Sequence, residues 1–132
     1  MEFGIQSFND RSFNEHMPRR KLDPLPSAAF QILLALANEH LHGYAIMRQV
    51  ADHTGGRMRL GPATLYGSIH TLLEEGMIQE AEVPVLDESG DERRRYYRIT
   101  AVGRKTACDE AERLADILRI ARAKRILRGE HV

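Results

Sequence analysis

The chain has 132 residues, 42% of them hydrophobic, which is enough for one hydrophobic core and makes a single domain the expectation. Its 19 Lys and Arg residues balance 19 Asp and Glu residues, so no overall field draws it toward nucleic acid or an anionic membrane. Any polyanion must therefore be met by a local patch. The single cysteine, Cys108, excludes an internal disulfide and a multi-thiolate metal site.

The chain shows no sign of a membrane or secretion segment. No apolar run approaches the roughly 18 residues that span a bilayer. The N-terminal sequence MEFGIQSFNDRSF lacks both a basic start and an apolar signal core. We therefore expect a cytoplasmic protein that does not associate with membranes.

Residues 1–26 have no sustained hydrophobic period and are expected to form a flexible N-terminal arm. Within them Arg19, Arg20 and Lys21 form a basic run that fits a phosphate or minor-groove contact. A solvated charge run on a mobile tail explains the same residues, and both interpretations stay open.

Two helices are predicted next. Ser27 is expected to cap the first, AAFQILLALANE, whose inward stripe contains Ala29, Ile32, Leu33 and Leu36. After NEHLHG, a second helix is predicted from Gly43 to Thr54, with Gly55 and Gly56 ending it. The residues at helical spacing in this second helix are Tyr44, Met47, Val50 and Ala51.

The stretch LGPATLYGSIHTLLEEGMI predicts a third helix with clear ends. Gly61 can act as the cap, Pro62 suits the first turn, and Gly76 can take the left-handed conformation that stops a helix. The apolar stripe consists of Leu65, Ile69, Leu72 and Leu73. Three helices in this order indicate a helix-turn-helix core.

Beyond Gly76 the spacing of the hydrophobic residues changes from the helical period of about 3.6 residues toward the strand period of about 2. MIQEAEVPVL and RRRYYRIT are predicted strands, and the acidic segment DESGDE between them favours a turn. Pro84 cannot donate a ladder hydrogen bond, so it belongs at an edge or a strand end. A helix-turn-helix followed by a β-hairpin, or wing, is the winged-helix arrangement.

A long helix is predicted from Thr100, as its cap, to about Arg128, with Gly103 as a weak position. Its apolar seam has no intramolecular partner left in a compact winged helix, so a second subunit is expected to cover it. The expected dimer interface residues are Ala107, Ala111, Leu114, Ile117, Leu118 and Ala121.

The predicted fold class is therefore mainly α with a small β-hairpin. The arm covers residues 1–26, a winged helix-turn-helix domain covers 27–100, and a C-terminal dimerisation helix covers 101–132.

The outer face of the predicted third helix fits the major groove of DNA because its residues are small or polar. The candidate contacts there are Thr64, Tyr66, Gly67, Ser68, His70 and Thr71. Alternatively, Tyr66 packs its ring against the second helix and His70 is a solvated surface residue. The face carries no Arg, Lys, Asn or Gln, so specificity is expected to depend on shape and on contacts with thymine methyl groups.

Positive charge comes from neighbouring segments. Arg93, Arg94 and Arg95 follow the predicted turn of the hairpin and can reach the DNA backbone or minor groove, as can Arg57 and Arg59 before the third helix. The hairpin also carries acidic residues, so ion pairs within it are the alternative role for its arginines.

No catalytic or metal-binding pattern is present. The histidines are scattered, a lone thiol lacks a defined partner, and phosphate-cradling loops, nucleophile elbows and HExxH are absent. We therefore predict no enzyme activity, no cofactor and no metal. Cys108 could serve as a redox sensor, or simply as a small core residue near the dimer seam.

Three segments in this order, HGYAIMRQV, LGPATLYGSIHTLLEEGMI and RRRYYRITAVGRK, resemble a PadR-type transcriptional regulator over about residues 25–128. The resemblance implies a winged-helix homodimer of the short type, with a single C-terminal helix for dimerisation. It also implies binding to a roughly palindromic operator on double-stranded DNA, usually as a repressor released by a small molecule or a stress signal. The N-terminal arm is longer than the family pattern requires. The chain also has no Trp, so the resemblance does not identify an effector.

The zero net charge leaves a second hypothesis. A winged-helix module can bind another protein through the wing or the final helix without touching DNA. A continuous positive strip across the third helix and the wing favours DNA, and an acidic interruption favours a protein partner.

Overall fold

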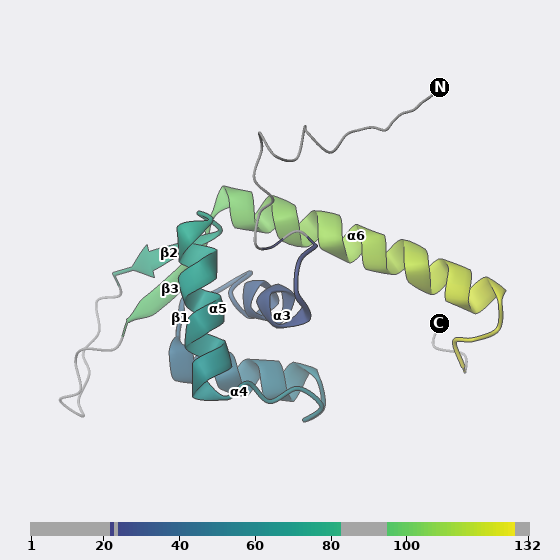
Figure 1. The fold of residues 1–132 in the computed structure, drawn as a ribbon, viewed down its shortest axis with the longest axis horizontal. Coiled ribbons are helices and arrows are strands. Elements are labelled where there is room, and N and C mark those ends of the chain that lie inside the picture. The colour runs from purple at the N-terminus through teal and green to yellow at the C-terminus, as the bar shows by residue number, and fades with distance from the viewer. Residues whose placement is uncertain (1–21, 23, 83–94, 129–132) are drawn as a thin grey trace, which may run out of the picture.

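Three helices pack around one hydrophobic core, with a small sheet at one side and a long final helix that extends beyond it (Figure 1). The computed structural model describes residues 22, 24–82 and 95–128. Its elements are α3 (Ser27–Ala35), β1 (Leu41–His42), α4 (Gly43–His53), α5 (Pro62–Glu74), β2 (Ile78–Ala81), β3 (Tyr96–Ile99) and α6 (Ala101–Ala123). In these described ranges, no helix combines the length and the apolar character that crossing a membrane requires.

Helix α3 lies at the centre and packs against α4, α5 and α6. Its predicted inward stripe is confirmed, since Ala29, Ile32, Leu33 and Leu36 are all buried. The predicted cap is wrong: Pro26 is the N-cap and Ser27 is already helical. Pro26 has an extended backbone, and its carbonyl oxygen accepts the first helical hydrogen bond from Phe30 N at 3.0 Å. The helix therefore begins one residue earlier than the preference for Ser caps indicates.

Helix α4 buries a different set of residues from the set at helical spacing in the sequence, with Val50 common to both. His42 caps it, because its Nδ1 accepts a hydrogen bond from Ala45 N at 3.2 Å. The buried residues of α4 include Ile46 and Val50, whereas Tyr44, which shares helical spacing with Val50 in the sequence, is 57% exposed. Helical spacing fits either the set with Tyr44 or the set with Ile46. Packing against α3 buries the set with Ile46 and leaves Tyr44 at the surface.

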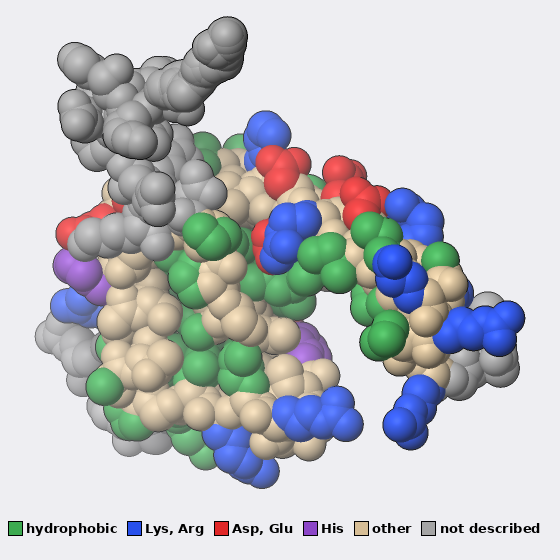
Figure 2. All heavy atoms as spheres, turned by 45° about the vertical axis from the view of Figure 1, so that its right-hand side comes forward, with side chains coloured by type: hydrophobic (Ala, Val, Ile, Leu, Met, Phe, Trp, Pro, Cys, Tyr) green, Lys and Arg blue, Asp and Glu red, His purple; other side chains and the backbone are tan. Residues whose placement is uncertain are grey.

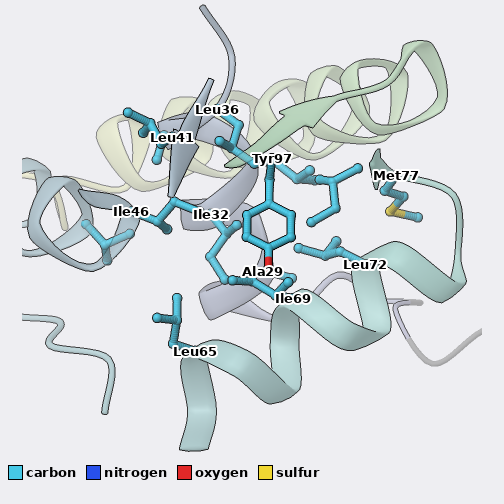
Figure 3. Close-up of a cluster of buried hydrophobic side chains, with 14 of the residues drawn as sticks. Ala29, Ile32, Leu36, Leu41, Ile46, Leu65, Ile69, Leu72, Met77 and Tyr97 are labelled. Atoms are coloured by element: carbon cyan, nitrogen blue, oxygen red, sulfur yellow. The ribbon is translucent and has the colours of Figure 1, made fainter. Parts of the chain in front are cut away.

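Helix α5 agrees with the sequence prediction in its ends and in its buried face. Gly61 is the N-cap, Pro62 opens the first turn, and Gly76 follows the helix with φ +73°. Figure 3 shows the buried side chains of α5 in the core, with the ring of Tyr97 directed from β3 toward them. The fully buried residues of α5 are Leu65, Ile69 and Leu72.

The sheet has three antiparallel strands in the order β1-β3-β2, one more than the predicted hairpin. Ile78 pairs with Ile99, and Leu41 pairs with Tyr97. Strand β1 has two residues, too few for an alternating pattern to be visible in the sequence. The predicted tip of the hairpin, including Pro84, lies outside the described residues.

Taken together, three helices and a wing formed by β2 and β3 make a winged helix-turn-helix with a long C-terminal helix. The segment before α3 contributes to the core as well. Leu22 is 7% exposed and Leu25 packs against the core. The last residues of the predicted arm therefore belong to the folded domain.

Helix α6 begins as predicted at Thr100, whose hydroxyl oxygen accepts from Gly103 N at 3.1 Å. It ends at Ala123, short of the predicted Arg128. Gly103 is not a weak position but the buried contact of α6, because a Cβ there would overlap the carbonyl oxygen of Met77. The glycine lets the helix lie directly on the backbone at the start of the sheet.

We predict that Gly103→Ala lowers the free energy of unfolding by about 1–3 kcal/mol, since the added methyl group overpacks against fixed backbone. Helix propensity alone would give the opposite sign, a gain of about 1 kcal/mol. Gly67→Ala on α5 is the matched control, because nothing lies within 4 Å of its added methyl group. Urea denaturation should show destabilisation for the first variant and stabilisation for the control. Equal stabilisation of both would contradict the close contact.

Candidate nucleic-acid interface

The turn between α4 and α5 is held by hydrogen bonds around Thr54. The Thr54 hydroxyl donates to the carbonyl oxygen of Val50 at 2.9 Å and accepts from Met58 N at 3.0 Å. Gly55 and Gly56 follow with φ +62° and +82°, values that favour glycine. These contacts fix the direction in which α5 leaves α4, and with it the direction of the outer face of α5.

That outer face is open to solvent. Thr64, Gly67 and His70 are exposed, whereas Ser68 and Thr71 are partly exposed. The Thr71 hydroxyl donates to the carbonyl oxygen of Gly67 at 3.1 Å, which leaves its lone pairs for an outside donor. His70 Nε2 lies 3.2 Å from Glu74 Oε2 on the same helix. The sequence prediction of a small, polar outer face agrees with this surface.

Tyr66 packs against the second helix, which was one of its two interpretations from the sequence, and stays largely exposed. Its ring leans on the first residue of α4, since a Cβ added to Gly43 would lie 2.5 Å from Tyr66 Oη. The side chain is nevertheless 52% exposed. Tyr66 therefore bridges the two helices while about half of the residue remains exposed.

The described candidate arginines lie in the connection before α5 and on the wing. Arg57 and Arg59 are exposed in the α4–α5 connection, and the guanidinium of Arg59 lies over Gly56. On the wing, Arg95 Nη1 is 3.3 Å from Glu80 Oε2 across the strand pair. Both partners are more than half exposed, so this ion pair is weak and can be exchanged for another anion. Two further predicted contacts, Arg93 and Arg94, lie outside the described residues.

The structure adds an aromatic and basic surface on α4 that the sequence analysis missed. The Arg48 guanidinium lies 5.6 Å from the ring centre of Tyr44. The His42 ring stacks against Tyr44 with ring centres 6.5 Å apart. They line a hollow of about 330 Å³. The i, i+4 spacing of Tyr44 and Arg48 was the available signal.

The predicted dimer residues are distributed along one side of α6. Ile117 is 46% exposed and Leu118 is 50% exposed. Of the others, Ala107, Leu114 and Ala121 are half-buried, and Ala111 is exposed. Figure 2 shows apolar side chains along the part of α6 that overhangs the rest of the chain.

The remaining surface of α6 is charged. Arg113 donates to Glu110 through Nε at 3.0 Å and through Nη2 at 2.5 Å, which lowers the pKa of the Glu110 carboxyl below its usual range. Cys108 is exposed. Among residues 22, 24–82 and 95–128, no three His, Cys, Asp or Glu side chains form a group that could hold a metal ion.

Comparison with solved structures shows the same fold. A transcriptional regulator from Clostridium thermocellum is 26% identical with a TM-score of 0.60, over 73% of this chain and 87% of that chain. A PadR family transcription regulator from Clostridium difficile is 19% identical with a TM-score of 0.64, over 74% of this chain and 97% of that chain. Bacillus subtilis PadR, solved in complex with operator DNA, is 21% identical with a TM-score of 0.55, over 64% of this chain and 46% of that chain.

Among curated sequences, an uncharacterized 37.1 kDa protein of a Streptomyces fradiae transposon is 36% identical over 91 residues. These residues are 67% of this chain but only 23% of that relative, so the chain spans about a quarter of its length.

The model of the transcriptional regulator PadR-like family matches residues 32–108, more than half of the chain. The matched region runs from α3 through the helix-turn-helix and the wing into α6. The resemblance found in the sequence is thereby confirmed: this chain belongs to the PadR-like family of transcriptional regulators.

Proposed function

We propose that this regulator binds a palindromic operator on double-stranded DNA as a homodimer, with the outer face of α5 in the major groove. The observation that carries the proposal is the combination of that small, exposed face with exposed arginines in the connection before it and on the wing. Gly67 has open space above it, Arg59 precedes the helix, and Arg95 lies on the wing. The solved complex of the Bacillus subtilis relative with operator DNA supports this choice.

On this proposal, the groove is recognised mainly by fit. The residues of α5 include no Arg, Lys, Asn or Gln, the side chains that form bidentate contacts with bases. Thr64 and Ser68 offer hydroxyl groups, and the bare backbone at Gly67 allows close approach. Sequence preference then comes from thymine methyl contacts and from the shape of the groove.

Affinity comes from phosphate contacts at the edges of the groove. Arg57 and Arg59 lie before the N-terminal end of α5, and Arg95 immediately precedes β3, at the end of the strand pair that is farther from α6. Arg93 and Arg94 are proposed to add contacts from the wing. Such contacts release counterions and bind most DNA sequences about equally.

The second subunit is proposed to pack on the overhanging part of α6. Its large exposed apolar residues, Ile117, Leu118 and Ile120, would be left in water by a monomer. Figure 2 shows a hollow between the overhanging part of α6 and the rest of the chain, with apolar side chains of α6 beside it. A two-fold axis there would place the two α5 helices in successive major grooves, about 34 Å apart.

We further propose that the dimer represses transcription by occupying its operator, and that a small molecule or a stress signal releases it. The family supports this role, since repression with release is its usual mode.

Selection of bound fragments from random DNA tests the proposal directly. We expect recovered sites to contain two inverted half-sites whose centres are about 10 base pairs, or one helical turn, apart. Recovery of no common sequence, with binding no tighter than to random DNA, would contradict it. That outcome would favour a winged helix that binds a protein.

The proposed division between affinity and specificity gives a first prediction. Arg59→Ala should weaken binding to operator and random DNA alike and reduce the slope of log affinity against log salt by about one. Thr64→Ala should weaken operator binding by about 1 kcal/mol and leave random DNA unaffected. Arg119→Ala is the control, since its guanidinium pairs with Asp116 on α6 at 2.7 Å. Fluorescence anisotropy titrations at several salt concentrations measure all three, and identical effects of the first two would contradict the division.

The contact between Tyr66 and Gly43 gives a second prediction. Gly43→Ala should move the phenol ring, because the added methyl group meets Oη at 2.5 Å and two ring carbons at 3.0 and 3.1 Å. The operator affinity should then fall about as far as in Tyr66→Ala, while stability changes little because the ring can swing outward. In the double variant the two losses should not add. Additive losses would show that Gly43 does not act through Tyr66.

A further inference from the structure

The end of α5, the base of the wing and the start of α6 meet at one point. Thr100 stands at the centre of it. Its hydroxyl group donates to the carbonyl oxygen of Gly76 at 2.6 Å, and its backbone N–H donates to the carbonyl oxygen of Met77 at 3.0 Å. The same hydroxyl accepts from Gly103 N at 3.1 Å. One threonine therefore joins the residue that ends α5 to the first turn of α6.

Part of this contact is buried, although the hydrogen bond from Thr100 to Gly76 is exposed. Met77 is 1% exposed and Gly103 is buried, with the α6 backbone seated on the Met77 carbonyl group. Gly76 has φ +73°, so the chain turns there in a conformation that few other residues adopt. The strand pair Ile78 and Ile99, at the end of the wing nearest α5 and α6, adjoins the contact. We call Gly76, Met77, Thr100 and Gly103 the Thr100 joint.

We propose that the Thr100 joint sets the angle between α5 and α6, and thereby determines which spacing of operator half-sites the dimer accepts. The proposal rests on the proposed function, since it assigns the joint a role in a dimer that reads two half-sites. Thr100 is a positioning residue in it and does not touch DNA.

Geometry shows why a small change at the joint would matter. Ile117 lies 14 residues beyond Gly103, which is about 20 Å along a helix with a rise of 1.5 Å per residue. A rotation of about 10° at the joint would move a point 20 Å away by about 3.5 Å, close to the spacing of one base pair. A loosened joint would thus let the dimer accept half-sites one base pair closer or farther apart.

Other contacts of α6 would not replace the joint. The guanidinium of Arg104 donates to the carbonyl oxygen of Ala37, and Ala107 packs against the core. Arg104 has a long, flexible side chain that can follow a rotation of the helix. Helix α3 packs against both α5 and α6 and therefore limits their arrangement as well. The backbone contacts at Gly103 and Thr100 join the end of α5 directly to α6, and they have no such freedom.

Four variants separate the joint from its helix-capping role. Thr100→Val removes both hydroxyl hydrogen bonds. Thr100→Asp keeps an oxygen that caps α6 but removes the donor to Gly76. Thr100→Ser keeps both functions. Thr106→Val is the matched control, because the Thr106 hydroxyl donates within α6, to the carbonyl oxygen of Val102 at 3.0 Å.

The first measurement uses a series of operators whose half-sites differ in spacing by single base pairs. The wild type, Thr100→Ser and Thr106→Val should prefer one spacing strongly. Thr100→Val and Thr100→Asp should lose about tenfold of that preference while remaining dimers by analytical ultracentrifugation. An unchanged spacing preference in Thr100→Val and Thr100→Asp would overturn the proposal. A wild-type spacing preference in Thr100→Asp alone would also overturn it, because the effect of Thr100→Val would then come from the loss of the helix cap. A fall to monomers would also overturn it, by assigning Thr100 to dimer stability.

The second measurement needs no DNA. Spin labels at His70→Cys and Glu112→Cys, in a Cys108→Ser background and diluted with unlabelled protein, report the distance between α5 and α6 within one chain. The distance distribution should be narrow in the wild type and broader in Thr100→Val and Thr100→Asp. Distance distributions of equal width in the wild type and in both Thr100 variants would overturn the proposal, whatever the DNA-binding result. Failure of the wild type to bind any operator would instead contradict the proposed function, and the label distances would still decide the role of Thr100.

Discussion

The contact between α3 and α5 holds the other elements in place. Ile32 and Leu33 of α3 and Leu65 and Leu72 of α5 are all 0% exposed. Burying four such side chains contributes about 6–12 kcal/mol, as large as the net stability of a small domain. Because these buried residues fix α5, most of its other face is not needed for the core, with Tyr66 against α4 as the exception. That face can therefore carry small residues such as Gly67, whose cost in helix propensity is about 1 kcal/mol.

Hydrogen bonds have a different role from the buried side chains. One such bond contributes about 0.5–1.5 kcal/mol, too little to hold the helices together. Its direction, however, limits the angle between the elements it joins. Thr54 does this between α4 and α5, and Thr100 does it between α5 and α6. Both threonines join the ends of helices, where backbone groups lack helical partners.

Electrostatics act locally in this chain because its total charge is zero. The ion pairs on α6, such as Lys105 with Asp109 at 3.1 Å, are exposed and contribute little to stability. Their effect is to keep one side of α6 in water and so to leave the apolar side for packing. The arginines near α5 work in the opposite way, since exposure keeps their charge available for an anionic partner.

The sequence by itself determined the order of the helices, the ends and buried face of α5, the two strands of the wing and the cap of α6. These features depend on local periodicity and on Gly, Pro and Thr at helix ends, so neighbouring residues suffice to specify them. The small outer face of α5 followed from the same periodicity.

Only the tertiary structure decided the remaining features. It showed β1 pairing with β3, the exposure of Tyr44, the contact of Tyr66 with Gly43 and the burial of Gly103. Each depends on which surfaces meet across long separations in the chain. Helix propensity marks Gly103 as unfavourable. The reason for a glycine there is visible only in the folded protein, where the Met77 carbonyl group leaves no room for a Cβ. Local sequence specifies where helices begin and end, whereas packing decides how they face one another.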